Sequence, residues 1–468
     1  MRNLSRPVNR LPPEILSYIA RYLIEDRDWN ASSIVPLTHV CRYWRESIIS
    51  APGIWTLVSD DNEDMARVCL QRAKAAPLKI TFCMPLGSSF SNIFAPHFQT
   101  TRFLVVYSIP TIEELTSVFP NPLQSMPTLR SLELRRSFDV ADWDWLIDPF
   151  DSSIPALECL VLEDIPLYPS LLGLATLTEL AIECTHFDLP LDTLLDFLEG
   201  NPALERVILE IYFPDDSLLS LQRKTVTRNQ IRYLCIRADK TDVQALIPNI
   251  PLQRGAGLDI FLDDDDGEGG TLDDFLPDVS TAHLSNPPSP TSFKLEHGPY
   301  SKRITLDGPG GKLSFYGISL LEASFADLAV LPLADVREVC LNYRKKTGQT
   351  TLKPPAFYPT YFPALETLTI DCNADVLGIL SVLLSNSPPS PSLKTIGFLN
   401  CDLPEEVMEE ITKFASERQN TLTSTWLHRV QIVHSDGVFP SAASIRRLRE
   451  YVKIVETRIE DKFSTDLM

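Results

Sequence analysis

The chain has 468 residues, 44% of them hydrophobic and 22% charged, a composition typical of a folded protein with more than one core. Its formal net charge of −20 repels phosphate backbones and anionic membranes, so we expect neither a nucleic-acid nor a membrane partner. The cysteines occur singly, without CxxC spacing, which favours a reducing compartment. No apolar leader is visible, and no apolar run is long enough for a membrane helix. These features predict a soluble intracellular protein of the cytoplasm and/or nucleus.

Two amphipathic helices are predicted at the N-terminus. In "LPPEILSYIARYLIEDRDW", Pro12 and Pro13 favour a helix start, and apolar residues follow at helical spacing. In "LTHVCRYWRESIISAPGIW", one helical face is predicted to hold Leu37, Val40, Cys41, Trp44 and Ile48. Together they span about 45 residues, too few to be stable alone, so their apolar surface must pack against the rest of the chain or another protein.

These two stretches resemble the F-box, whose pattern is Leu-Pro-x-Glu-Ile/Leu-Leu, an apolar helix, Val-Cys-x-x-Trp and a closing Pro-x-Leu/Ile-Trp. The matching residues are Leu11, Pro12, Glu14, Ile15, Leu16, Ile19, Leu23, Val40, Cys41, Trp44, Pro52 and Trp55. The resemblance implies that residues 1–58 dock on a Skp-type adaptor, and through it on a cullin, in an SCF-type ubiquitin ligase. It implies an adaptor-binding set of Leu11, Pro12, Ile15, Leu16, Ile19, Leu23, Leu37, Val40, Trp44, Pro52 and Trp55. The alternative is that Trp44 and Trp55 pack on the following domain.

Residues 59–97 are predicted to hold a connector helix and a first strand, "PLKITF". Beyond them the pattern Leu-x-x-Leu-x-Leu recurs, as in "MPTLRSLEL", "IPALECLVL" and "NPALERVIL", mostly at intervals of 20 to 29 residues. This period, with one short strand per unit, is typical of leucine-rich repeats, whose cores only stacked neighbours can close. One interval of 105 residues predicts about four further degenerate repeats. The copies resemble the leucine-rich repeats that accompany an F-box in many fungal proteins, and Cys401 is the clearest copy of their Asn/Cys position.

We therefore expect an α/β fold, a short helical F-box followed by a leucine-rich-repeat horseshoe (an α/β solenoid) over residues 98–425. Helices such as "LPLDTLLDFLEGNP" and "ADVLGILSVLLSNSPP" would lie outside the strands. Within residues 252–316, "GLDIFLDDDDGEGGTLDD" predicts a strand and a solvated acidic loop that does not fit an EF-hand, and "KRITLDGPGGKLSFYG" predicts an inserted β-hairpin. Residues 426–468 are predicted to form a strand and a capping helix, "ASIRRLREYVKIVETRIED". The alternative is an α/β domain whose strands merely look alike.

No motif in the sequence indicates catalysis. The histidines are scattered, no HExxH, Cys/His cluster or GxSxG occurs, and "GPGGK" lacks the spacing of a P-loop. We therefore expect a non-catalytic receptor subunit without cofactor or metal. The alternatives are a leucine-rich-repeat scaffold that delivers no ubiquitin, and an unrecognised hydrolase built on an α/β array.

One row of charged residues is predicted on the outward face of the strands. Because side chains alternate between the two faces of a strand, Glu163, Glu183 and Glu210 should stand side by side, with Arg135 and Arg237 at the ends of the row. Stacked like charges are unfavourable unless water or a cationic partner offsets them, and the chain's net charge of −20 predicts no internal counter-charge. The row is either a solvated acidic surface or a site that receives a Lys- or Arg-bearing segment of a protein substrate.

Overall fold

The structure, a computed structural model, comprises two compact units, residues 1–230 and 231–468. The structure describes residues 11–25, 33–83, 93–109, 111, 126–136, 156–168, 171, 173–183, 189–213, 225–227, 230–253, 255–262, 290–297, 302–309, 311–316, 331, 333–343, 361–372, 376–385, 392–421, 427–434 and 440–459. Within these residues, no helix has the length and apolar character that a bilayer crossing requires.

The first unit begins with three short helices and a 3-10 turn: α1 (Pro13–Glu25), α2 (Ile34–Thr38), α3 (Arg42–Ile49) and η3 (Pro52–Ile54). The single helix expected from Leu37 to Ile48 is wrong, because the chain is extended at Cys41 between α2 and α3. Polar groups stabilise this break: the Thr38 hydroxyl donates to the Val35 carbonyl, and the Arg45 side chain donates to the Thr38 carbonyl at 2.9 Å.

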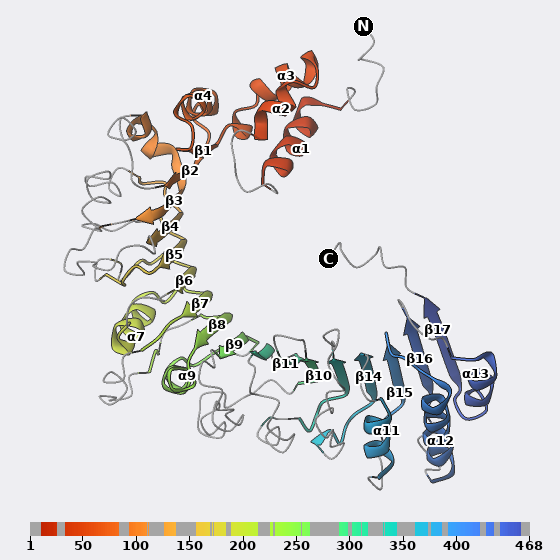
Figure 1. The fold of residues 1–468 in the computed structure, drawn as a ribbon. Coiled ribbons are helices and arrows are strands. Elements are labelled where there is room, and N and C mark those ends of the chain that lie inside the picture. The colour runs from red at the N-terminus through yellow and green to blue at the C-terminus, as the bar shows by residue number, and fades with distance from the viewer. Residues whose placement is uncertain are drawn as a thin grey trace. The chain divides into compact units, whose positions relative to one another are not determined.

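The rest of the first unit is a parallel open sheet with helices packed beside it (Figure 1). Its elements are β1 (Leu57–Ser59), α4 (Glu63–Ala73), β2 (Leu78–Cys83), η4 (Ala95–Thr100), β3 (Thr101–Ile109), β4 (Ser131–Arg136), β5 (Cys159–Glu163), β6 (Glu179–Glu183), α7 (Leu191–Gly200) and β7 (Arg206–Glu210). Strands β1 to β7 pair in parallel in chain order, each of the first six with the strand that follows it. The predicted connector helix is confirmed as α4, but "PLKITF" is the second strand, since β1 precedes it.

The recurring six-residue pattern forms the core of the sheet. Its three apolar positions are buried in every copy described, for example Leu157, Leu160 and Leu162. Register places equivalent positions opposite one another, so Leu160 pairs with Leu132 and Leu180 on the neighbouring strands. Each copy therefore buries its apolar residues against the next one.

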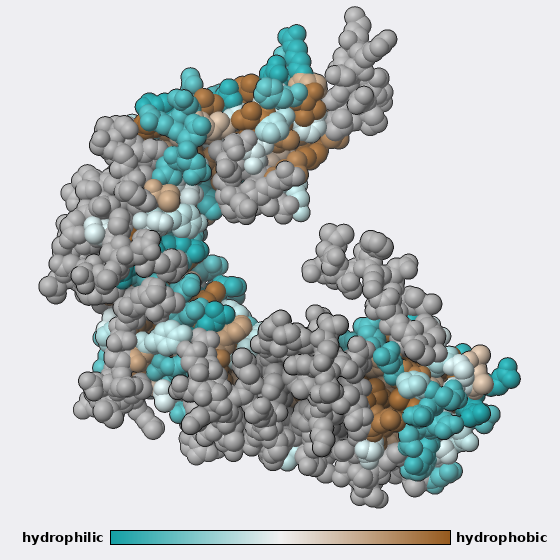
Figure 2. Space-filling view, viewed as in Figure 1, coloured by the Kyte–Doolittle hydropathy of each residue, from teal (hydrophilic) through white to brown (hydrophobic). Residues whose placement is uncertain are grey.

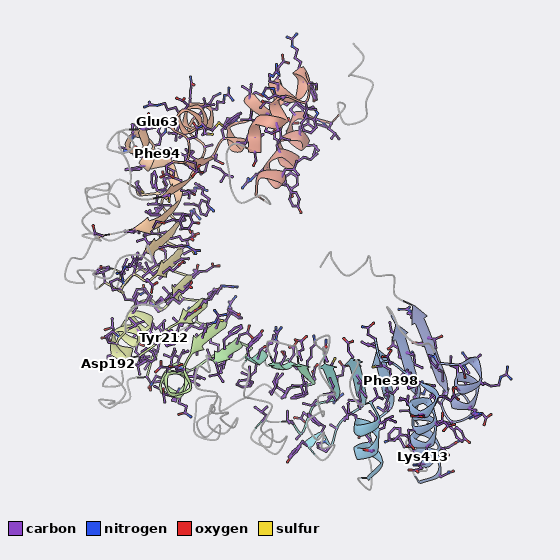
Figure 3. All side chains as sticks on the ribbon, in the orientation of Figure 1. Glu63, Phe94, Asp192, Tyr212, Phe398 and Lys413 are labelled. Atoms are coloured by element: carbon purple, nitrogen blue, oxygen red, sulfur yellow. The ribbon has the colours of Figure 1, made fainter. Side chains whose placement is uncertain are left out.

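The second unit is a mixed open sheet with helices α9 (Lys240–Leu246), α11 (Val376–Ser385), α12 (Glu405–Thr421) and α13 (Ala442–Leu448) and the 3-10 turn η6 (Ile247–Asn249). Its strands are β8 (Tyr233–Ala238), β9 (Gly257–Leu262), β10 (Ser292–His297), β11 (Lys302–Gly308), β12 (Gly311–Tyr316), β13 (Glu338–Tyr343), β14 (Thr367–Cys372), β15 (Thr395–Leu399), β16 (Arg429–His434) and β17 (Ile454–Ile459). Strands β13 to β17 pair in parallel in chain order. In Figure 3, α12, which carries Lys413, lies beside β15 and β16, and β15 carries Phe398.

The predicted hairpin is confirmed, with Asp307 opposite Lys312 in the antiparallel pair β11–β12. Strand β10 adds a third strand, and the sheet runs in the order β9–β12–β11–β10–β13. About four further degenerate repeats were expected here, and four strands, β9, β12, β11 and β10, do lie between β8 and β13 in the sheet, but β11 is antiparallel to both of its neighbours. The acidic loop and its EF-hand comparison, residues 263–274, lie outside the described residues.

The predicted C-terminal capping helix is too long. Only Ala442–Leu448 is helical, and the following residues form strand β17, parallel to β16. The stretch Ile454–Ile459 is rich in β-branched residues, which favour a strand where a sheet edge can pair with them. The mixed charge of this stretch predicted a helix, but its local strand preference decides the structure.

Gly311, the first residue of β12, approaches the backbone of the loop that precedes β9. Gly311 has φ +126, and a Cβ there would lie 2.3 Å from the Ala256 carbonyl oxygen. We expect Gly311→Ala to lower the free energy of unfolding by about 1–3 kcal/mol. An alanine is strained at this φ, and its Cβ must displace the backbone at Ala256. Gly53→Ala is the control, since its Cβ would meet nothing within 4 Å. Equal urea midpoints for the two full-length variants would contradict this account.

Candidate functional site

Helix α1 has an apolar surface wider than its own domain covers. Successive residues turn by about 100°, so Tyr18, Tyr22, Ile15 and Leu23 cover an arc of about 140°, and Leu16 and Ala20 continue it. Leu16 and Ala20 are fully buried, whereas Ile15 is 45%, Tyr18 71% and Tyr22 63% exposed. The smaller part of the apolar arc thus packs inside the protein, and the larger part faces solvent. We call the exposed residues of the arc, Ile15, Tyr18, Tyr22 and Leu23, the α1 face.

Other exposed apolar residues are Val35 on α2, Val40 between α2 and α3, and Ile49 at the end of α3. In Figure 2 hydrophobic surface gathers over these N-terminal helices. Several large exposed apolar side chains within one small group of helices are typical of a protein interaction surface. The predicted adaptor-binding set left out Tyr18, Tyr22, Val35 and Ile49, although helical spacing had placed Tyr22 on the apolar face of the first helix. Helical periodicity offered the signal for the two tyrosines, which stand three and seven residues after Ile15.

The predicted adaptor-binding residues divide into three groups by exposure. Ile15, Leu23, Val40 and Pro12 are exposed; Leu11, Ile19, Leu37 and Pro52 are half-buried; and Leu16, Trp44 and Trp55 are buried. The buried side chains pack beneath the exposed surface and hold it in place. The free surface that can receive a partner consists of the first two groups and of the residues that the predicted set left out.

Trp55 packs inside the chain, where it links the N-terminal helices to α4. Its indole nitrogen donates to the Ile48 carbonyl at 2.9 Å, and the Arg72 guanidinium of α4 lies 4.3 Å from its ring centre. The Tyr43 hydroxyl donates to the Leu11 carbonyl, which fixes the start of α1 against α3. These contacts hold the α1 face in place on a folded support.

Comparison with known families gives one match: residues 8–59 match the F-box-like family. Residues 8–59 are an F-box-like domain. F-box domains generally bind Skp1-type adaptors, so the F-box-like domain and its α1 face are this protein's candidate adaptor site. A search of curated proteins found no match.

The second candidate surface is the row of glutamates on the first unit's sheet. Register confirms the row: Arg135 stands opposite Glu163, Glu163 opposite Glu183, and Glu183 opposite Glu210. Glu183 is exposed, Glu210 half-buried and Glu163 8% exposed. Burial raises the pKa of Glu163 and the Glu183 carboxylate raises it further, while Arg135 opposes both.

Arg135 gives part of this row an internal counter-charge, which the sequence analysis did not expect. Its guanidinium lies 2.6 Å from Glu163 and 2.6 Å from Glu133, close to the Tyr107 ring. The expectation that the chain has no internal counter-charge for this row is therefore wrong at Glu163, because a net charge of −20 does not prevent a local ion pair. Arg237 belongs to the second unit, where its guanidinium stacks over Phe261, the residue opposite it on β9.

A metal or catalytic centre was not expected, and that expectation stays untested. Among the described residues, no group of three or more His, Cys, Asp or Glu side chains lies in a metal-binding arrangement.

Proposed function

We propose that this protein is the substrate-recognition subunit of a cullin–RING (SCF-type) ubiquitin ligase. The observation that supports this function is the α1 face, an exposed apolar surface inside an F-box-like domain. In this role the F-box-like domain binds a Skp-type adaptor, which connects the protein to a cullin. The protein itself is non-catalytic, because the other subunits transfer the ubiquitin, and it works in the cytoplasm or nucleus.

We also propose that the strands form a leucine-rich-repeat solenoid of the horseshoe type. Three features support this. Parallel strands pair in chain order over β1 to β7 and β13 to β17, and several copies enter their strand through the same turn, as when the Leu204 amide donates to the Asn201 carbonyl. The Cys401 thiol is buried and donates to the Ile370 carbonyl of the preceding strand. The substrate-binding residues proposed on this array are Glu163, Glu183, Glu210, Arg135 and Arg237.

Affinity purification of the tagged full-length chain tests the ligase role. We expect a Skp-type adaptor and a cullin to copurify, and an Ile15→Ala/Tyr22→Ala variant to lose both. A second purification with the proteasome blocked should recover ubiquitin-modified proteins that bind the intact chain. Partners recovered without adaptor or cullin would instead support the alternative, a repeat scaffold without a ligase role.

A further inference from the structure

The sheet of the second unit ends in an open edge at β17. Among the described strands, β17 pairs only with β16, and in Figure 1 it stands outermost in this unit. Its six residues follow β16 in unbroken register, and the strand contains neither the bulge nor the proline that commonly protects an edge. The strand β1 of the first unit, by contrast, is only three residues long. The residues Ile454–Ile459 therefore offer a complete strand edge for pairing.

Three residues of β17 direct their backbone groups to this edge. The Ile454 amide donates to the His428 carbonyl at 3.0 Å, so Ile454 directs its backbone toward β16. Backbone groups alternate in direction along a strand, so the N–H and C=O groups of Val455, Thr457 and Ile459 point the other way. These are the donors and acceptors that an added strand would use.

The hydrophobic core is also incompletely covered at β17. Val430 and Ile432 of β16 are fully buried. Their register partners on β17 are Val455, which is half-buried, and Thr457, which is exposed. Apolar surface at this end of the core would therefore become buried if another strand followed β17.

Two side chains of opposite charge lie on the outward face of β17. Glu456 and Arg458 are two residues apart in the strand, so they share a face, and Thr457 stands between them. Arg458 is exposed. The Glu456 side chain is 44% exposed, although one of its oxygens lies 3.5 Å from the Arg429 guanidinium of β16. A strand with one negative and one positive charge on either side of a central residue is complementary to a reversed copy of itself.

Antiparallel pairing of β17 with the β17 of a second copy brings these charges together. Residues that direct their backbone to the edge must pair with each other, which leaves two registers that align most of the strand. The register centred on Glu456 places this glutamate opposite its own copy. The register centred on Thr457 places each Glu456 opposite the Arg458 of the other copy, at a position where opposing Cα atoms lie only about 4.5 Å apart. Because opposite charges stabilise such a pair and like charges destabilise it, the charges select the register centred on Thr457.

We propose that the protein forms a homodimer in which the β17 strands of two copies pair antiparallel, centred on Thr457. The inference does not depend on the proposed ligase role. The interface is the same surface on both copies, so it closes at two copies and does not extend into a fibre. It is a small interface, because one strand of each copy contributes, so we expect a reversible dimer that forms as the concentration rises.

Analytical ultracentrifugation of the full-length protein tests the dimer. We expect the average mass to rise with concentration from 52.6 kDa, the mass of one copy, towards that of two. Glu456→Arg leaves only basic side chains at the two charged positions, and Arg458→Glu leaves only acidic ones. Each variant alone therefore faces like charges and should dimerise at least about tenfold more weakly. Mixed together, the two variants should form a heterodimer, because each then faces opposite charges, and this recovery also shows that both are folded.

A backbone variant and a control complete the test. Thr457→Pro should abolish the dimer, because it removes an amide that the second copy needs and that does not take part in the pairing with β16. The charge-matched control is Glu338→Arg, at an exposed glutamate of β13, a strand that is paired on both sides. It should dimerise like the unmodified protein. A mass that stays at one copy at every concentration, or single β17 variants that dimerise as well as this control, would overturn the proposal.

Discussion

Replacing Ile15 and Tyr22 together with alanine is expected to weaken adaptor binding about a thousandfold, because two truncated hot-spot contacts of about 2 kcal/mol each are lost. Both side chains are exposed on the α1 face, and neither supports the core of the F-box-like domain. The fold should therefore stay intact, and titration calorimetry with a purified Skp-type adaptor would measure the change directly.

The choice of residues matters for this test. Leu16 is completely buried, so Leu16→Ala would remove adaptor binding by unfolding the domain as readily as by removing a contact. A matched control is Phe103→Ala/Leu377→Ala, which truncates two apolar side chains of 43% and 37% exposure outside the F-box-like domain. Adaptor affinity that is the same for both double variants would reject the α1 face as the docking site.

Leu204→Ala is expected to lower the free energy of unfolding by about 2–5 kcal/mol, the cost of a cavity in a packed core. Leu204 is 1% exposed and begins the copy of the six-residue pattern that leads into β7. In a stacked array each copy supports its neighbours, so the loss should spread beyond β7 to β6 and α7. Urea denaturation measures the magnitude, and hydrogen exchange with mass spectrometry shows the spread.

The control for Leu204→Ala is a substitution in β7, the strand that follows Leu204. Ile208→Ala truncates a half-buried side chain of β7 on the outward face, so it should cost clearly less than Leu204→Ala. Exchange protection that falls only at residues next to Leu204, or nowhere, would count against a solenoid. Protection of α1 and α3 serves as the internal reference, since these helices have their own core.

Much of the fold could be predicted from local patterns in the sequence. The Leu-x-x-Leu-x-Leu copies predicted strands β4 to β7 and their register, because alternation alone decides which side chains of a strand share a face. The same alternation predicted the row of Glu163, Glu183 and Glu210. The Leu-Pro-x-Glu and Trp signature located the F-box-like domain, which the family match confirms at residues 8–59.

Tertiary structure alone decided which of these residues a partner can reach. Leu16 and Ile15 are adjacent and equally apolar, yet packing of α1 against α3 buries one and leaves the other exposed. Likewise, Arg135 and Glu163 are neighbours only because β4 and β5 pair, and their ion pair changes the charge that the row presents. The pairing of β12 with β9 and of β10 with β13 has the same origin. There, contacts between residues distant in sequence outweigh a local preference of a few tenths of a kcal/mol or so per residue, and no local pattern contains those contacts.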